Sequence, residues 1–487
     1  MGKNYCAIDL GASHGRAVIG RIEKNKLTLD PIHDFANSPI HLLGSRHWDP
    51  FYIFREIQTA LKKTSHSYGP DIDGIGVDSW GIDFSLFDCN YEMLGMPYSY
   101  RDTRTNPLYE EILNKIDRFS FFEMTGVRLL PMQEICQLYA MRRQNSKLLC
   151  AAEYILNMAE MFSFWLSGRP VSEHTMAGGC GWYDISTGGL AEKLFELFSI
   201  PKDIFPEIVQ PGTVLGQLLP EIQKKTGLGP VPVVIPAAHD TANVTAAIPS
   251  EPDSNRAFLN SGTWGIIGTV SHQPMITREA FETGITNFPT YNRMYMNVCM
   301  FTNLWLIQEC RKCWRERGHD LAYEDITQLA IESEPMTAFV DPDDQCFSAP
   351  LDMEDTVKRF CTETGQQVPA GIGPTARVVF ESLALKCRDL LRNIQTVHNT
   401  TFQVLHILGG GAVNMFLNQL IADAADIRVM AGPAEATAVG NIMIQAIETD
   451  SLDSPAAARE TVRNSFEITA FMPKHTDVWS EATFPSR

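Results

Sequence analysis

Residues 5–20 constrain the fold of this chain more than any other stretch, because they combine a strand, a tight polar turn and a second strand. The turn contains two glycines, which let a backbone bend sharply and approach a ligand closely. It also contains amide, hydroxyl and cationic donors, which together suit a phosphate group. These residues are Gly11, Gly15, Ser13, His14 and Arg16. An ordinary glycine turn between two strands would look the same in isolation.

The same scheme of strand, glycine turn and strand returns at residues 257–268. Residues 405–414 likewise resemble residues 74–81, since each stretch joins an apolar strand to a glycine turn. A repeat this far apart indicates a duplicated domain and not a solenoid, whose repeats span about 20–50 residues. We therefore expect an α/β protein with two related halves around a central cleft.

The chain has 487 residues, which exceeds what one hydrophobic core usually serves, so two domains are expected. We place the N-terminal domain at residues 1–248 and the C-terminal domain at residues 249–487, with a proline-containing connector at residues 249–255. Residues from about 101 to 199 read as a helical elaboration of the first domain. Helices are predicted at residues 107–116, 134–144, 157–167, 373–397, 415–425 and 433–447, and the tail after residue 450 reads as helix and coil.

Charge and hydrophobic pattern exclude several classes of partner. A net charge of -18 and a pI near 5.1 leave no basic footprint for nucleic acid. No uninterrupted apolar run reaches the roughly 18 residues that a membrane-spanning helix needs. The 11 cysteines follow an N-terminus without an apolar export segment, which predicts free thiols in the cytoplasm. The oligomeric state, monomer or homodimer, stays open.

Aspartates lie where predicted strands end, which is where ligands bind in α/β sheets. Asp9 precedes the glycine turn, Asp78 and Asp83 lie in the turn within residues 73–88, and Asp240 opens a helix after a short strand. Capping would explain each of them in isolation. Together they suit phosphoryl transfer, which needs phosphate donors, a carboxylate for magnesium and a second carboxylate to align and deprotonate the acceptor. We predict that Asp9 serves the magnesium ion and that Asp240 is the base.

Residues 11–15 also match G-x-S-x-G, the nucleophile elbow of serine hydrolases. An elbow needs a helix directly after the serine, whereas residues 16–22 read as a strand. The Walker phosphate loop and the G-x-G-x-x-G dinucleotide fingerprint are absent from the sequence. Any nucleotide must then be held by the glycine hairpins of the two domains.

The chain is similar over essentially its whole length to the FGGY carbohydrate kinases of the actin, sugar kinase and heat-shock chaperone superfamily. The similarity rests on the Asp9 hairpin, residues 74–83, 239–241 and 261–264, and the glycines at 409–411. It implies two RNase H-like domains that close on MgATP and a ketose sugar. It also implies that Asp240 removes the proton from the 1-hydroxyl group of that sugar.

The resemblance further implies which residues bind each ligand. The residues implied for the nucleotide are Ala12, Ser13, His14, Gly15, Arg16, Thr263, Gln308 and Gly410. The residues implied for the sugar are Gly81, His239, Asp240 and Thr241. We add Asp83 and, with a shift of alignment, Asn297 as sugar candidates, and we keep Asp9 as the candidate for Mg2+.

The closer markers within the family resemble those of members that phosphorylate L-rhamnulose; they lie at residues 9–16, 78–84, 100–105 and 425–436. Two segments depart from that pattern. Residues 132–134 are Met-Gln-Glu where Phe-Asn-Thr is usual, and Met300 and Asn303 replace an asparagine and a glycine, so Asn297 would serve only with a shift of alignment.

The identity of the sugar therefore stays open, with L-fuculose or another ketose or polyol as the alternative. Residues 173–178 are similar to the L-fuculose kinases of the family. A non-enzymatic sugar sensor is a more distant alternative. The presence of both Asp9 and Asp240 argues against a sensor, which would have no need of the base.

Overall fold

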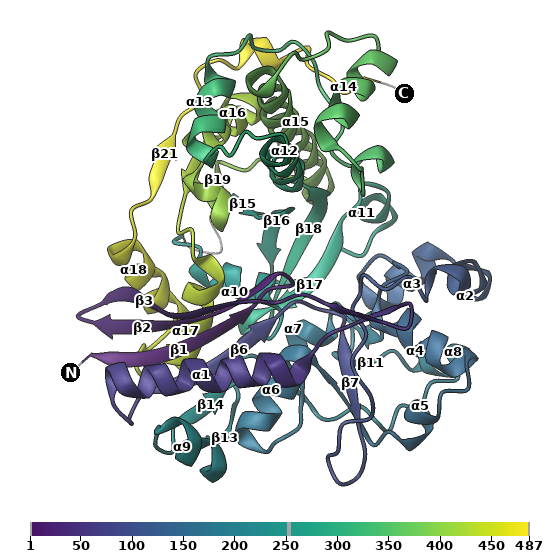
Figure 1. The fold of residues 1–487 in the computed structure, drawn as a ribbon, viewed down its shortest axis with the longest axis vertical. Helices are drawn as coiled ribbons and strands as arrows, with labels where there is room; N and C mark the ends of the chain where they lie inside the picture. Colours follow the sequence, from purple (N-terminus) through teal and green to yellow (C-terminus); the bar gives the residue numbers. More distant parts are fainter. Residues whose placement is uncertain (1, 251–254, 486–487) are drawn as a thin grey trace.

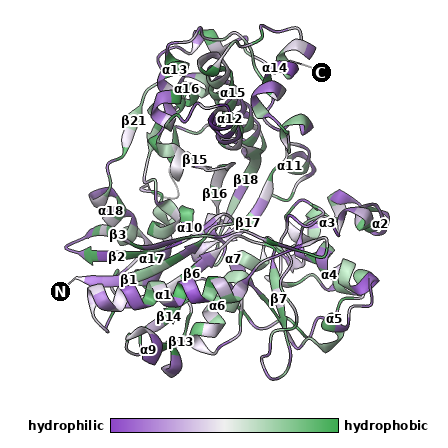
Figure 2. Ribbon diagram, in the orientation of Figure 1, coloured by the Kyte–Doolittle hydropathy of each residue, from purple (hydrophilic) through white to green (hydrophobic). Residues whose placement is uncertain are grey.

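A computed structural model describes residues 2–250 and 255–485, which form two lobes that each contain one large sheet (Figure 1). The predicted connector at residues 249–255 falls largely outside the described residues. In the described ranges, no helix is long and apolar enough to cross a membrane. Figure 2 shows hydrophobic residues along the inner strands and hydrophilic ones on outward-facing turns of the helices.

The first sheet has the order β13-β14-β6-β1-β2-β3. Strands β1, β2 and β3 are antiparallel neighbours, whereas β6 and β14 run parallel to β1. The strands are β1 (Lys3–Leu10), β2 (His14–Glu23), β3 (Lys26–Ala36), β6 (Gly74–Ser79), β13 (Val214–Gln217) and β14 (Pro232–Val234).

Strand β1 is buried on both faces, because a helix covers each of them. Alternate side chains of a strand point to opposite faces. Cys6 and Ile8 pack in one cluster with the helix α1 (Pro50–Tyr68), and Tyr5 and Ala7 pack in another with the helix α17 (Ala436–Glu448). The uninterrupted apolar run of β1 therefore follows from its place at the centre of a three-layer lobe.

The second sheet repeats the arrangement of the first, with the order β17-β18-β16-β15-β19-β20-β21. The segment β18-β16-β15-β19-β20 corresponds to β3-β2-β1-β6-β14, with the same pattern of parallel and antiparallel pairs. The predicted duplication is thereby confirmed. The strands are β15 (Arg256–Ser261), β16 (Trp264–Ser271), β17 (Thr286–Thr290), β18 (Met294–Thr302), β19 (Val404–Leu408), β20 (Arg428–Ala431) and β21 (Thr469–Phe471).

Helices and short ladders complete both lobes. Around the second sheet lie α11 (Arg278–Glu282), α12 (Trp305–Glu316), α13 (Tyr323–Ile331), α14 (Met353–Glu363), α15 (Ile372–His398), η5 (Gly410–Val413) and α16 (Met415–Ala425). The first lobe contains α2 (Tyr109–Lys115), α3 (Arg118–Thr125), α4 (Glu134–Arg143), α5 (Lys147–Ala151), α6 (Met158–Ser167), α7 (His174–Ala177), α8 (Glu192–Phe198), α9 (Pro220–Thr226), α10 (Asp240–Val244) and η2 (Thr245–Ala247). Its short ladders pair β4 (Ile40–Leu42) with β5 (Ser45–His47), β7 (Phe84–Phe87) with β8 (Tyr154–Asn157), β9 (Ser172–Glu173) with β12 (Ile208–Val209), and β10 (Tyr183–Asp184) with β11 (Gly189–Leu190).

Helix α17 returns from the second half of the chain to the sheet of the first lobe, where it contacts β1, β6 and α10. Nearly all of its side chains are buried. The close approach requires glycines, since a Cβ atom on Gly76 would lie 2.6 Å from the Asn441 side chain and one on Gly440 would lie 1.9 Å from the Asn243 carbonyl oxygen. The helix α18 (Pro455–Ser465) follows on the same lobe beside β3.

Replacing Gly440 with alanine should destabilise the fold. Alanine improves helix propensity by about 1 kcal/mol, but the clash with the α10 backbone requires a movement of one helix, and we expect a net loss of at least about 2 kcal/mol. Urea unfolding measures this loss. The control is Gly189→Ala, whose nearest neighbour would lie 3.9 Å away and whose effect should stay within about 0.5 kcal/mol. Equal stability of the two variants would contradict the tight helix contact.

Candidate active site

The strand pairing of the first lobe brings three aspartates together. Asp9 lies directly opposite Asp78 in the parallel register of β1 and β6. Ser79, the next residue of β6, forms a bridge with His239, which precedes Asp240. The proximity of the three carboxyls has an electrostatic effect: burial, then Asp9, with Asp240 contributing less, raises the pKa of Asp78 well above its usual range.

Asp240 begins α10, and its side chain is 32% exposed. Its Oδ1 atom accepts hydrogen bonds from the backbone N–H (2.6 Å) and the hydroxyl (3.2 Å) of Thr241. Its Oδ2 atom has no hydrogen-bond partner among the residues that the structure describes. Burial, followed by the nearby Asp9 carboxylate, raises the pKa of Asp240 to about 7. The group can therefore accept a proton near neutral pH, and its Oδ2 atom makes no competing hydrogen bond within the described residues.

The imidazole of His239 lies beside this carboxylate, with 3.6 Å between Nε2 and Asp240 Oδ1. Burial lowers the pKa of His239 to about 4, so the ring is neutral. Its Nδ1 atom is buried and has no partner within the described part of the chain. Gly81 lies next to the ring, since a Cβ atom on Gly81 would be 3.6 Å from His239 Cδ2. A buried orphaned nitrogen beside a glycine is a site where a ligand hydroxyl could bind.

The hairpin at residues 11–16 presents its polar atoms unevenly. Ser13 and His14 are exposed and Ala12 is half-buried, so a ligand can reach all three. Gly15 is buried instead, and a Cβ atom there would lie 2.3 Å from the Phe35 ring. The second glycine of the turn is thus required for packing against β3 and not for the approach of a ligand.

Arg16 connects the hairpin to the metal candidate. Its Nε and Nη2 atoms donate to Asp9 Oδ2 at 3.0 and 2.9 Å. Its Nη1 atom pairs with Glu435, which precedes α17. The guanidinium is therefore shared between two carboxylates and leaves the other oxygen of Asp9 for further contacts.

The nucleotide candidates of the second lobe are neighbours. The Thr263 hydroxyl donates to Gln308 Oε1 at 3.1 Å. The adjoining glycine loop is packed against the β15 end, because a Cβ atom on Gly411 would lie 2.0 Å from Ser261 Oγ. Gly410, in contrast, has open space beside its Cα atom. The loop is therefore fixed on one side and accessible on the other.

Asp83 is fully buried, and its Oδ2 atom accepts three hydrogen bonds. The donors are Trp48 Nε1 (2.6 Å), Trp80 Nε1 (2.9 Å) and the backbone N–H of Tyr100 (3.0 Å). Burial raises the pKa of Asp83 to about 6. Asp83 thus orients two tryptophans whose ring centroids are 4.3 Å apart. Trp48 belongs to no recognisable sequence motif, and its contact with Asp83 arises only in the folded chain.

Asn297 lies away from any exposed surface. Its amide is fully buried in β18, where it donates to Asn287 Oδ1 and accepts from the hydroxyl of Ser271. Both of its polar atoms are therefore used inside the second lobe, and the structure does not bring it to the sugar candidates. Met300, which occupies the alternative position, is 45% exposed.

Glu134, which departs from the usual family pattern, lies in the core of the first lobe. It is fully buried, and its Oε2 atom accepts from Asn157 Nδ2 at 2.8 Å. Its Oε1 atom is buried and accepts no hydrogen bond from the residues that the structure describes. Four other carboxyls of the first lobe are buried to a similar degree: Asp78, Asp83, Glu160 and Glu173. Burial raises the pKa of Glu134 to about 7 and that of Glu173 to about 7 as well.

The two sheets share one strand order, and Asp9 and Asp78 lie near the ends of neighbouring central strands of the first sheet, so the chain has a duplicated α/β fold with carboxylates at one sheet edge. The model of the FGGY family of carbohydrate kinases, N-terminal domain, matches residues 4–247, and that of the C-terminal domain matches residues 257–449. The chain belongs to the FGGY family of carbohydrate kinases, and it is a sugar kinase.

Curated relatives agree with this assignment, and solved structures share the fold. The chain is 36% identical to the rhamnulokinase of Bacteroides thetaiotaomicron over 485 residues, covering 99% of this chain and 98% of that protein. It is 32% identical to the rhamnulokinase of Bacillus subtilis, covering 97% and 96%. The fold is similar to that of xylulose kinase from Lactobacillus acidophilus (TM-score 0.81, 17% identity, 98% and 96% covered). It is also similar to that of Plasmodium falciparum glycerol kinase with ADP (TM-score 0.80, 15% identity, 97% and 94% covered).

The buried carboxyl of Glu134 should make stability depend on pH. Its pKa is raised from 4.5 to about 7 in the folded protein, so the folded state binds more protons over this interval, and the free energy of unfolding falls as pH rises. Glu134→Gln removes the titrating group and therefore its contribution to the pH dependence of the free energy of unfolding. Between pH 5 and pH 8 the variant should lose about 2 kcal/mol less stability than the wild type, as measured by urea unfolding.

The matched control for this measurement is Glu221→Gln, which makes the same chemical change at an exposed residue of α9. Its stability should follow the wild-type pH dependence. If the Glu134→Gln variant also follows it, the Glu134 carboxyl does not bind the additional proton.

Proposed function

We propose that this kinase transfers the γ-phosphoryl group of ATP to the 1-hydroxyl group of L-rhamnulose, forming L-rhamnulose 1-phosphate and ADP. The observation that carries the proposal is Asp240, whose pKa is raised to about 7 by burial and by the nearby Asp9 carboxylate, and whose Oδ2 atom has no partner among the described residues. The choice of sugar is supported by the full-length likeness to proteins named rhamnulokinase. A cytoplasmic location is supported by free, buried thiols such as Cys6, Cys136 and Cys180.

The nucleotide would lie between the lobes. The exposed turn supplies Ala12, Ser13 and His14, with Gly15 and Arg16 behind them, and the second lobe supplies Thr263, Gln308 and Gly410. The open space beside Gly410 lets a flat or charged group approach the backbone closely. Exposed backbone N–H groups and hydroxyls are suitable donors for phosphate oxygens.

Asp9 fits a role beside magnesium. Mg2+ is commonly bound through one or two carboxylates together with substrate phosphates and water, and the described residues contain no cluster that would hold a metal by itself. One oxygen of Asp9 is held by Arg16, which fixes the carboxylate and leaves the other oxygen for the ion or its water. When bound, magnesium neutralises charge on the transferring phosphoryl group.

The sugar would bind at Gly81, His239, Asp240 and Thr241, with Asp83 behind them. Neutral His239 can exchange a hydrogen bond with a sugar hydroxyl through its free Nδ1 atom. Asp240 Oδ2 accepts the proton of the 1-hydroxyl group, whose oxygen attacks the γ-phosphorus as the bond to ADP breaks. Alignment of that oxygen is the larger part of the task, because a phosphoryl transition state needs little covalent assistance.

A coupled ADP-release assay with L-rhamnulose, L-fuculose, L-xylulose and L-ribulose tests the function. We expect the highest kcat/KM with L-rhamnulose. A preference for L-fuculose would retain the kinase and change its substrate. If no ketose or polyol stimulates ADP release above background, the proposed reaction is wrong and the sugar-sensor alternative is favoured.

Asp240→Asn should lower kcat by roughly two to four orders of magnitude, the range that loss of a general base usually gives. The amide retains an acceptor for the Thr241 N–H and should leave ATP affinity within about twofold. Titration calorimetry with ATP and steady-state kinetics measure the two quantities. Wild-type turnover in this variant would reduce Asp240 to a helix-capping residue.

A further inference from the structure

Glu173 and Thr175 lie directly behind the segment that carries the base, on β9 and α7, and both are fully buried. The Glu173 carboxylate accepts hydrogen bonds from the Thr175 hydroxyl (2.5 Å) and from the backbone N–H groups of Thr175 and Met176. It also accepts one from the backbone N–H of Ala238 at 3.0 Å. One buried carboxylate thus joins the start of α7 to the residues before Asp240.

The Thr175 hydroxyl extends this contact by one residue. Because it donates its hydrogen to Glu173, its lone pairs face away from the carboxylate, and one of them accepts the backbone N–H of His239 at 3.3 Å. The backbone N–H groups of Ala238 and His239, which precede the base, are therefore bonded to Glu173 and to Thr175, respectively. Removing the hydroxyl would leave the His239 N–H buried without a partner, which folded proteins avoid.

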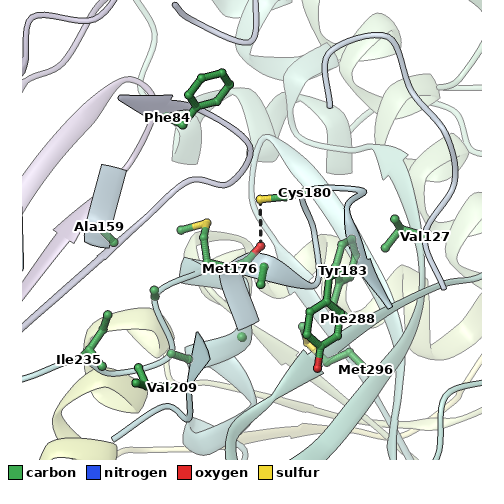
Figure 3. Close-up of a cluster of buried hydrophobic side chains, with 14 of the residues drawn as sticks. Phe84, Val127, Ala159, Met176, Cys180, Tyr183, Val209, Ile235, Phe288 and Met296 are labelled. Atoms are coloured by element: carbon green, nitrogen blue, oxygen red, sulfur yellow. Dashed lines mark hydrogen bonds between the residues drawn. The ribbon is translucent and has the colours of Figure 1, made fainter. Parts of the chain in front are cut away.

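The segment is fixed from its other side as well. The backbone N–H of Ser79 donates to the Ala238 carbonyl at 2.9 Å. Glu173 is itself held by Glu160, whose Oε1 atom accepts the Glu173 backbone N–H at 2.6 Å. Around α7 the packing is apolar and dense, with Met176, Ile235 and Phe288 in the same cluster (Figure 3). The backbone before Asp240 consequently has little freedom, although α10 has only 5 residues.

We propose that Glu173 and Thr175 are positioning residues for the base: they hold the backbone at Ala238 and His239 so that the Asp240 carboxylate points at the sugar hydroxyl. This inference rests on the proposed kinase reaction. Neither residue touches the substrate in this arrangement, so both act only through Asp240. A displacement of about 1 Å at a reacting group can cost roughly a hundredfold in rate.

Thr175→Val removes the hydroxyl while keeping the shape of the side chain. We expect kcat to fall roughly 10- to 100-fold and the KM values for sugar and ATP to stay within about twofold, since only the base is displaced. Thr175→Ser retains the hydroxyl and should restore most of kcat. The control is Thr226→Val on α9, where the lost hydroxyl likewise accepts a backbone N–H within the core but donates to the Ile222 carbonyl instead of a carboxylate.

Combining Thr175→Val with Asp240→Asn separates positioning from general loss of structure. If Thr175 acts through Asp240, its replacement should leave the residual turnover of Asp240→Asn unchanged within about twofold, because residues that act as a unit are non-additive. An equal fall of kcat in both backgrounds, or wild-type kcat in Thr175→Val alone, would overturn the proposal.

Amide hydrogen exchange tests the same geometry without any turnover. In Thr175→Val the amides of Ala238 and His239 should exchange at least about tenfold faster than in the wild type, while Thr226→Val leaves them unchanged. Unchanged exchange in Thr175→Val would refute the positioning role even if no ketose proved to be a substrate. Absence of wild-type turnover would instead count against the proposed function.

Discussion

The parallel pairing of β1 with β6 is the interaction on which the site depends. It places Asp9 opposite Asp78, and the bridge from Ser79 to His239 then brings Asp240 to the same edge of the sheet. Because side chains alternate along a strand, a shift of one residue in this register would turn the carboxylates toward the opposite face. The register is enforced by packing: the two faces of β1 belong to different cores, with Ile8 in one and Ala7 in the other.

Buried carboxyl groups are a second organising feature of the first lobe. Asp83, Glu134, Glu160 and Glu173 receive hydrogen bonds from tryptophan rings, side-chain amides and backbone N–H groups. Acceptor groups of this kind can satisfy several donors at once, which suits the irregular backbone between short strands. Burying them is costly, and the hydrogen bonds that they accept offset part of this cost while holding the loops next to the site.

Much of the fold could be predicted from the sequence, because the alternation of strands and the position of glycines are local signals. The hairpin at residues 5–20, its repeat at residues 257–268 and several helices were read in this way. The partner of α17 could not be predicted, since Asn441 and Gln445 form a polar stripe that would be expected to face water, whereas both are buried and donate to carbonyls of the first sheet. The edge strand β21 in the tail was missed for a related reason, as its 3 residues pair only in the folded sheet.

The candidate site was predictable where a residue belongs to a motif, as with Asp9, Asp240 and the glycine loops. It was not predictable where a contact joins distant segments. Trp48 reaches Asp83 across 35 positions, and Glu173 reaches Ala238 across 65. Asn297 was predicted as a sugar candidate from its place in the sequence, but in the fold its amide is hydrogen-bonded to Ser271 and Asn287 on adjacent strands.

The return of α17 to the first lobe has a consequence for how the chain can be divided. Although each sheet is built from its own half of the sequence, the face of β1 that carries Tyr5 and Ala7 is covered by residues beyond position 435. A fragment ending near residue 250 would expose this apolar face to water and lose the Glu435 partner of Arg16. The duplicated halves are therefore not separable units: the N-terminal sheet acquires its final layer only after the C-terminal half has been synthesised.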